Sequence, residues 1–146
     1  MDFIQKELPE FITSNFPISS KREDTYIAGA SMGGYGAMHH YLRNVDKYSA
    51  CVALSPATKP DFLDESKYGY LRDHFLNAKG KQLNVYLSIG EKDFIIEASK
   101  NLNQFLIDNE IGVSYKFVPE YAHTWDLWEK EIHEVFAYFK NLGFIG

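Results

Sequence analysis

The sequence predicts an α/β fold, a three-layer αβα sandwich in which helices cover a parallel sheet of about four strands. Short apolar runs of strand length alternate along the chain with stretches that carry apolar residues at helical spacing. Three of these runs are apolar nearly throughout, which is typical of strands buried on both faces of a sheet. The chain has 146 residues, enough for one core, so we expect a single domain over residues 1–146.

The first part of the chain predicts a helix followed by a strand. Five apolar residues recur there at helical spacing: Phe3, Ile4, Leu8, Phe11 and Ile12. They indicate an amphipathic helix over residues 2–15 that Pro9 kinks and Pro17 closes off. The run TYIAGA, residues 25–30, then predicts a short buried strand.

The middle of the chain predicts a helix, a second strand and an insertion. Residues 33–43 favour a helix, and the apolar run SACVALSP predicts a strand that Pro56 stops. Residues 57–83 are rich in Asp, Lys and Tyr and fit the alternation of strands and helices poorly. We expect them to form a lid-like insertion with one short helix near residues 66–77.

The last part predicts two strands, each followed by a helix. NVYLSIG, residues 84–90, and residues 113–118 are the strands. The first is followed by a helical stripe over residues 95–106. The second is followed by a longer stripe that begins at Trp125: Trp125, Trp128, Ile132, Val135, Phe136 and Phe139.

Composition and charge exclude several classes of protein. The net charge is −5, whereas a nucleic-acid binder typically has an excess of basic residues that contact the phosphates. The single cysteine, Cys51, cannot form an internal disulfide and is expected to be a buried, inert thiol. No apolar stretch approaches the roughly 18 residues of a membrane span. The N-terminus lacks the layout of a signal peptide, so we expect a cytoplasmic protein without membrane partners.

The sharpest motif is Gly29-Ala30-Ser31-Met32-Gly33, a G-x-S-x-G between a predicted strand and a predicted helix. A nucleophile on such a tight turn needs small neighbours, and Gly29 and Gly33 meet that demand. The turn also sets Ser31 at the positive end of the helix, where the Met32 N–H can face a developing oxyanion. A P-loop would need a lysine where Tyr35 stands, and a dinucleotide fingerprint would need Gly or Ala at His39. A glycine-rich turn that serves packing alone is the remaining alternative.

A nucleophilic serine needs a histidine base and an acid that orients it. Asp93 follows the third predicted strand and His123 follows the fourth, in the order serine, acid, histidine. Asp93 could instead be only the N-cap of the next helix, and His123 an ordinary loop histidine. Glu91 is the rival acid.

The other candidate residues carry weaker signals. His39 and His40 are adjacent on a helix and point about 100° apart, so they cannot chelate one metal together. We expect His74 and His133 on solvated faces, and no cluster has metal-ligand spacing. The aromatic stripe from Trp125 is expected to pack in the core, while Trp125 and Trp128 could also wall an acyl pocket beside His123.

Three segments carry a resemblance to a known family: GASMGGYGAM, SIGEKDF and His123-Thr124-Trp125. Together they resemble the serine esterases of the α/β-hydrolase superfamily, in the group of tributyrin esterases, S-formylglutathione hydrolases, and feruloyl and acetylxylan esterases. The resemblance implies hydrolysis of a small-molecule carboxylic ester through an acyl-enzyme, with no metal or organic cofactor. It implies Ser31 as nucleophile, His123 as general base and acid, and Asp93 as the orienting acid.

Members of this group usually carry a further N-terminal part that holds the first half of the sheet and the second oxyanion donor. The resemblance therefore implies that this chain corresponds to the C-terminal part of the sheet. Two hypotheses follow. The chain is a serine carboxylesterase for short acyl esters, or it is a fragment without activity of its own. Such a fragment would associate through the exposed edge of the strand at 25–30, as a homo-oligomer or with a missing N-terminal segment.

Overall fold

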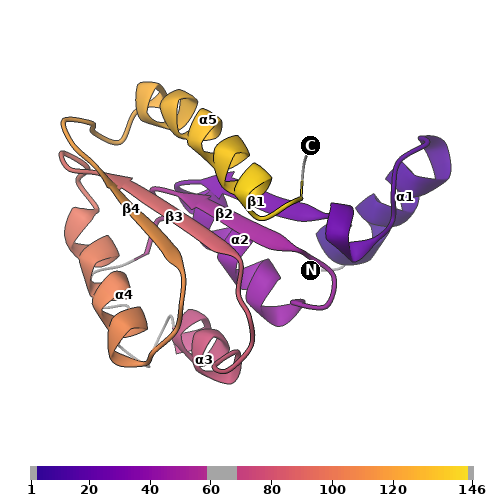
Figure 1. Cartoon of the computed structure of the whole chain (residues 1–146), viewed down its shortest axis with the longest axis horizontal. Helices are drawn as coiled ribbons and strands as arrows, with labels where there is room; N and C mark the ends of the chain where they lie inside the picture. Colours follow the sequence, from indigo (N-terminus) through magenta and orange to yellow (C-terminus); the bar gives the residue numbers. More distant parts are fainter. Residues whose placement is uncertain (1–2, 59–68, 145–146) are drawn as a thin grey trace.

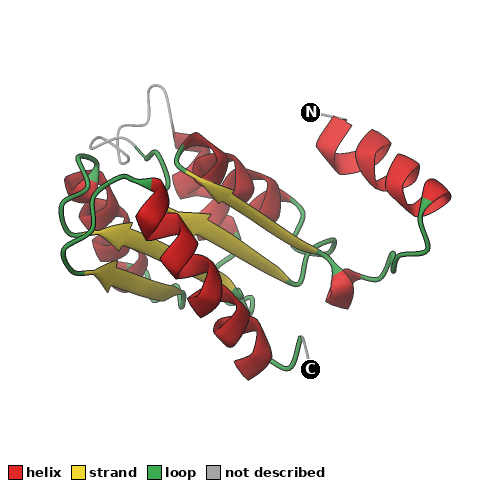
Figure 2. Ribbon diagram, turned by 90° about the horizontal axis from the view of Figure 1, so that it is seen from above, coloured by secondary structure: helices red, strands yellow, loops and turns green. Residues whose placement is uncertain are grey.

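The computed structural model describes residues 3–58 and 69–144, and its centre is a four-stranded parallel sheet in the order β1-β2-β3-β4 (Figures 1 and 2). The strands are β1 (Tyr26–Ala30), β2 (Ala50–Leu54), β3 (Val85–Gly90) and β4 (Ser114–Val118). A helix follows each strand: α2 (Met32–Arg43), α3 (Gly69–Asn77), α4 (Ile96–Asp108) and α5 (Trp125–Asn141). Before β1 lie η1 (Phe3–Glu7), α1 (Leu8–Asn15) and η2 (Arg22–Asp24).

Helices cover both faces of the sheet, so the predicted three-layer α/β arrangement is confirmed (Figure 1). On one face, α2, α3 and α4 pack against the sheet through buried side chains such as Met38, Phe75 and Leu102. On the other face, α5 packs through Val135 and Phe139.

The strands differ in burial because of their positions in the sheet. Every residue of β2 and β3 is buried, as their continuous apolar runs predict. β1 is only half-buried although its sequence is equally apolar. Among the described residues, β1 pairs with β2 and with no other strand, so it forms one edge of the sheet.

The segment predicted as a lid-like insertion, residues 57–83, contributes a core helix in the part that is described. The expected helix is present as α3, and its Leu71 and Phe75 are completely buried in the core beside α2. α3 is therefore the crossover helix between β2 and β3, which differs from the expected lid. Residues 59–68 lie outside the described residues.

The buried face of α5 differs from the predicted stripe. The buried residues are Leu127, Glu131, Val135 and Phe139. Ile132 and Phe136 of the predicted stripe are 48% and 57% exposed. The buried row recurs every fourth residue and includes a glutamate, which an apolar pattern cannot register.

The N-terminal helical segment extends away from the sheet (Figures 1 and 2). It begins as the π-helical η1 and changes to α-helix at Leu8, directly before Pro9, at the point where a kink was predicted. None of its residues is buried, so its apolar stripe packs on no core. Within residues 3–58 and 69–144, no helix has the length and apolar character needed to cross a bilayer.

Candidate active site

Ser31 occupies a strained turn between β1 and α2. Its backbone has φ 53° and ψ −120°, outside the conformations that a serine ordinarily adopts. Three backbone hydrogen bonds hold it there. The Ser31 N–H donates to the Leu54 carbonyl at 2.9 Å, and the Ser31 carbonyl accepts from Tyr35 and Ala57 at 3.1 and 2.9 Å. The neighbouring strand and helix therefore fix this conformation.

Close packing around the turn explains two of its glycines. A Cβ atom at Gly29 would lie 2.2 Å from the Gly33 carbonyl oxygen, and one at Gly34 would lie 3.2 Å from Pro56 Cα. A Cβ atom at Gly33 would meet nothing within 4 Å. The predicted need for a small residue is thus correct at Gly29 and wrong at Gly33. The second closely packed glycine is Gly34, where a Cβ atom would need its neighbours to shift by a few tenths of an ångström.

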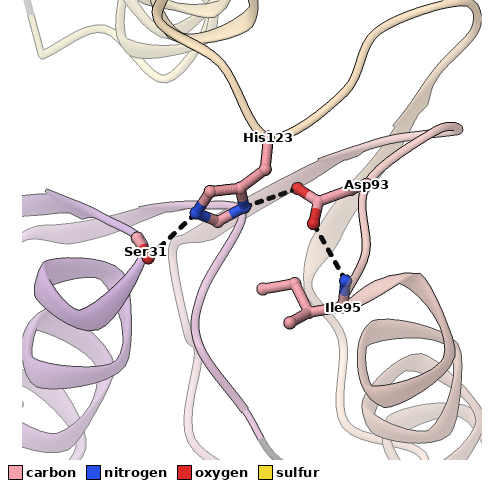
Figure 3. Close-up of polar contacts among 4 residues, drawn as sticks. All are labelled: Ser31, Asp93, Ile95 and His123. Atoms are coloured by element: carbon pink, nitrogen blue, oxygen red, sulfur yellow. Dashed lines mark hydrogen bonds and ion pairs between the residues drawn. The ribbon is translucent and has the colours of Figure 1, made fainter.

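The structure brings Ser31, His123 and Asp93 together in one line of hydrogen bonds (Figure 3). His123 Nε2 lies 3.0 Å from Ser31 Oγ, and His123 Nδ1 lies 2.8 Å from Asp93 Oδ2. A carboxylate only accepts, so Nδ1 carries the proton and Nε2 is free to accept from the serine hydroxyl. The Asp93 side chain is fully buried, and its other oxygen accepts from the Ile95 N–H at 3.0 Å. The N-cap residue of α4 is Ile95 and not Asp93, so the N-cap alternative is wrong, although the Asp93 carboxylate does accept the N–H of that residue.

The position of each residue follows from the topology. Ser31 follows β1, Asp93 follows β3 and His123 follows β4. Because all strands are parallel, their carboxyl ends meet at one edge of the sheet, where open α/β folds hold their sites.

The loops that carry Asp93 and His123 are bonded to each other. The Lys92 N–H donates to the Tyr121 carbonyl at 2.8 Å, and a Cβ atom at Gly90 would lie only 2.3 Å from that same oxygen. The rival acid, Glu91, accepts the Glu120 N–H at 3.1 Å. Glu91 therefore links the two loops by a hydrogen bond, while Asp93 is the acid that is hydrogen-bonded to the His123 imidazole.

Met32 is the first residue of α2, directly after the serine. Among the described residues its N–H has no backbone partner, as is usual in the first turn of a helix. The helix dipole adds partial positive charge at this end. The Met32 N–H is thus available to donate to an anionic oxygen of a group bonded to Ser31 Oγ.

Aromatic side chains surround the imidazole. The centroid of the Phe94 ring lies 4.8 Å from the centroid of the His123 imidazole. The centroid of the Trp128 ring lies 5.2 Å from the same imidazole centroid. Trp125 packs on Trp128 at 5.0 Å and is 74% exposed. The sequence reasoning missed Phe94. Its signal was an apolar residue directly after a candidate acid at a strand end.

The remaining candidates lie apart from this line. Cys51 is buried in β2, as expected, and burial raises the pKa of its thiol well above the ordinary value. His133 is exposed as predicted, but His74 is half-buried against His39, with ring centroids 5.2 Å apart. The prediction of a solvated His74 is therefore wrong. No group of three or more metal-ligating side chains occurs in the part of the chain that the structure describes.

Comparison with known proteins relates the chain to esterases. Residues 1–139 match the family described as "Putative esterase". The chain is 31% identical to an acetyl esterase of Caldicellulosiruptor saccharolyticus, over 97% of this chain and 64% of that protein. It is 26% identical to an S-formylglutathione hydrolase of Bos taurus, over 84% of this chain and 50% of that protein.

Solved structures give the same picture. An S-formylglutathione hydrolase from Staphylococcus aureus matches with a TM-score of 0.79 and 26% identity, over 94% of this chain and 59% of that one. The chain thus spans between half and two-thirds of the length of these relatives.

Proposed function

Because the chain belongs to the "Putative esterase" family and has the α/β-hydrolase fold, we propose that it hydrolyses carboxylic esters with a Ser-His-Asp triad. The observation that carries this proposal is the line of hydrogen bonds from Ser31 Oγ through His123 to the buried Asp93. A serine hydroxyl alone is a weak nucleophile, and this arrangement supplies the base and the acid that it needs.

In the proposed mechanism each residue has one step. Ser31 Oγ attacks the ester carbonyl carbon while its proton passes to His123 Nε2. Asp93 stabilises the resulting imidazolium through the Nδ1–H bond, and the Met32 N–H donates to the oxyanion. As the carbon–oxygen bond to the alcohol breaks, Nε2 returns the proton to the leaving oxygen, and the acyl group stays on Ser31. Water then repeats the sequence, with His123 as its base, and releases the acid and free Ser31.

We propose short acyl esters as substrates. The names of the relatives support this choice, because acetyl and formyl are the smallest acyl groups. Trp125 is the proposed substrate-binding residue. Its exposed ring, two residues after His123, packs on Trp128 and offers an apolar surface to an acyl group.

Hydrolysis of p-nitrophenyl acetate, butyrate and octanoate tests the proposal. We expect kcat/KM to fall as the acyl chain lengthens, and Ser31→Ala to lose about 10⁴-fold or more in kcat. Ser20→Ala, on an exposed loop, is the matched control and keeps wild-type rates. Fastest hydrolysis of the octanoate would contradict the short-chain assignment, and activity retained in Ser31→Ala would contradict the triad.

The edge strand favours a second candidate, in which the chain has no activity by itself and associates with further polypeptide. β1 carries apolar residues at a sheet edge, and such an edge is a template for pairing. The apolar stripe of α1 is also uncovered. Either a second copy or a separate N-terminal segment could pair there and supply a second oxyanion donor.

Light scattering combined with an activity assay over a range of protein concentrations separates the two candidates. Association-dependent activity requires the specific activity to rise with the fraction of assembled protein. A monomer with constant specific activity at every concentration would contradict the second candidate.

A further inference from the structure

The imidazole of His123 contacts two aromatic rings that come from different elements. Phe94 lies in the loop between β3 and α4, and its ring is tilted by 53° to the imidazole at 4.8 Å. Trp128 lies in the first turn of α5, and its ring stands nearly perpendicular to the imidazole, at 85° and 5.2 Å. These are ordinary geometries for favourable aromatic contacts.

The two hydrogen bonds of the imidazole act at its two nitrogen atoms, Nδ1 and Nε2. The ring is joined to the backbone by two rotatable bonds, Cα–Cβ and Cβ–Cγ, and rotation about either of them tilts the N–H and lone-pair directions away from Asp93 and Ser31. Hydrogen bonds weaken steeply as their angles degrade. Contacts against the ring that oppose these rotations therefore help to keep both bonds.

Trp128 is the better anchored of the two contacts. Its side chain is partly buried and packs against the buried cluster between α5 and the sheet. Its indole Nε1 is buried and, among the described residues, has no hydrogen-bond partner. Phe94, in contrast, is 80% exposed. The indole is therefore held by packing alone, and a phenyl ring in its place would leave no donor unpaired.

We propose that Trp128 and Phe94 are positioning residues that hold the His123 imidazole in line between Ser31 and Asp93. Trp128 supplies the fixed support from α5, and Phe94 limits the ring from the loop that also carries Asp93. Neither residue has a step in the proposed reaction. The inference rests on the proposed function, in which His123 must keep both bonds while it gains and loses a proton.

Both ring centroids lie within about 6 Å of the imidazole centroid, the range over which an aromatic face attracts a cation. During attack the ring becomes an imidazolium, and aromatic faces within about 6 Å attract a cation. A leucine fills space in place of either ring but provides no such attraction and less restraint on ring rotation. A phenylalanine at position 128 keeps an aromatic surface. Conservative and aliphatic variants are thus expected to differ.

Proton NMR of the His123 Nδ1–H, together with kcat and KM for p-nitrophenyl acetate, tests this role. The variants are Trp128→Leu, Trp128→Phe and Phe94→Leu. Phe136→Leu, an exposed aromatic residue farther along α5, is the control. We expect a sharp far-downfield resonance in the wild type, in Trp128→Phe and in the control. In Trp128→Leu the resonance should broaden and kcat should fall about 10- to 100-fold with KM nearly unchanged.

Each outcome decides the proposal. A sharp resonance and wild-type kcat in folded Trp128→Leu would overturn it, as would a wild type without the resonance. If Trp128→Leu does not fold, Phe94→Leu decides instead, because an exposed side chain can be replaced without loss of the core. An unchanged line width and kcat in Phe94→Leu would then reject the role. Resonances that behave as expected in a protein without esterase activity would support the positioning and reject the proposed function.

Discussion

At the scale of single residues, the conformation of Ser31 depends on two close approaches of backbone to backbone. Gly29 faces the Gly33 carbonyl, and Gly34 faces Pro56. The motif pattern alone could not tell which glycines are needed for space, because that depends on how the strand and the helix meet. The pattern did identify the turn, since a G-x-S-x-G between a strand and a helix has few other uses.

Gly29→Ala tests this close approach. A methyl group 2.2 Å from the Gly33 carbonyl oxygen must displace backbone, so we expect a loss of about 2 kcal/mol or more in the free energy of unfolding. Gly33→Ala is the matched control, because open space surrounds its Cβ position and alanine favours the helix by about 0.5–1 kcal/mol. Urea unfolding measures both changes. Equal stability of the two variants would contradict the packing argument.

Asp93→Asn tests the orientation of His123. The amide can keep the bond from the Ile95 N–H, but it no longer favours the tautomer with the proton on Nδ1. We expect kcat for p-nitrophenyl acetate to fall by about 10⁴-fold while the unfolding midpoint changes little. Glu91→Gln is the comparison, since Glu91 bonds the Glu120 N–H and not the histidine. A larger loss of kcat in Glu91→Gln would make Glu91 the acid.

At the scale of elements, α5 is fixed to the sheet by a buried carboxylate. Glu131 accepts from the Tyr86 hydroxyl at 2.7 Å and pairs with Lys116 at 3.1 Å. Burial, together with Glu131, raises the pKa of Tyr86 well above its ordinary value. An apolar periodicity cannot reveal such a residue, because its partners come from β3 and β4. For this reason the predicted stripe on α5 placed Ile132 and Phe136 on the wrong face.

Removal of the Glu131 carboxylate should therefore destabilise the fold. Glu131→Ala leaves the Tyr86 hydroxyl and Lys116 without this partner, and we expect a loss of about 3–5 kcal/mol in the free energy of unfolding. Glu134→Ala removes the half-exposed partner of the same lysine and should cost about 0–1 kcal/mol. Chemical denaturation of the two variants measures the difference. Similar losses in both would show that Glu131 is no anchor.

The contact between α2 and α3 predicts a pH dependence of stability. Burial, and then the nearby positive groups His74, Arg43 and His40, lower the pKa of His39 from 6.5. Burial and Arg43 likewise lower the pKa of His74, against the weaker opposite effect of Asp73.

The unfolded chain therefore binds more protons than the folded chain just below pH 6.5, so the stability contribution of these histidines is complete above that pH and falls as the solution is acidified. Thermal unfolding between pH 7.5 and 5 should show the loss, and His39→Phe with His74→Phe should reduce its slope. His133→Gln, at an exposed site, should leave the slope unchanged. A slope equally steep in the double variant would exclude this pair as its source.

At the scale of the whole molecule, the parallel sheet explains how three distant segments form one site. The alternation of strands and helices predicted that sheet, and the sheet brings the residues after β1, β3 and β4 to one edge. The sequence predicted that Trp128 could lie near His123, but it could not predict that the rings of Phe94 and Trp128 contact the imidazole itself. Those depend on how the loops pack across the sheet edge.

The number of oxyanion donors sets the kcat that we expect for ester hydrolysis. Esterases of this fold use two backbone donors for the oxyanion, and the Met32 N–H is the one that we propose for this chain. Loss of one such donor typically lowers kcat by about 10²- to 10³-fold. We therefore expect slow turnover from the chain alone, and labelling of the serine is a more sensitive test than turnover.

Reaction with a fluorophosphonate, followed by mass spectrometry of the digested protein, tests the central claim most directly. The reagent forms a stable bond only with a serine that a neighbouring base activates. We predict a single adduct on Ser31 in the folded wild type and none in Ser31→Ala or His123→Ala. A folded wild-type chain that stays unlabelled, or an adduct on another serine, would contradict the proposed site.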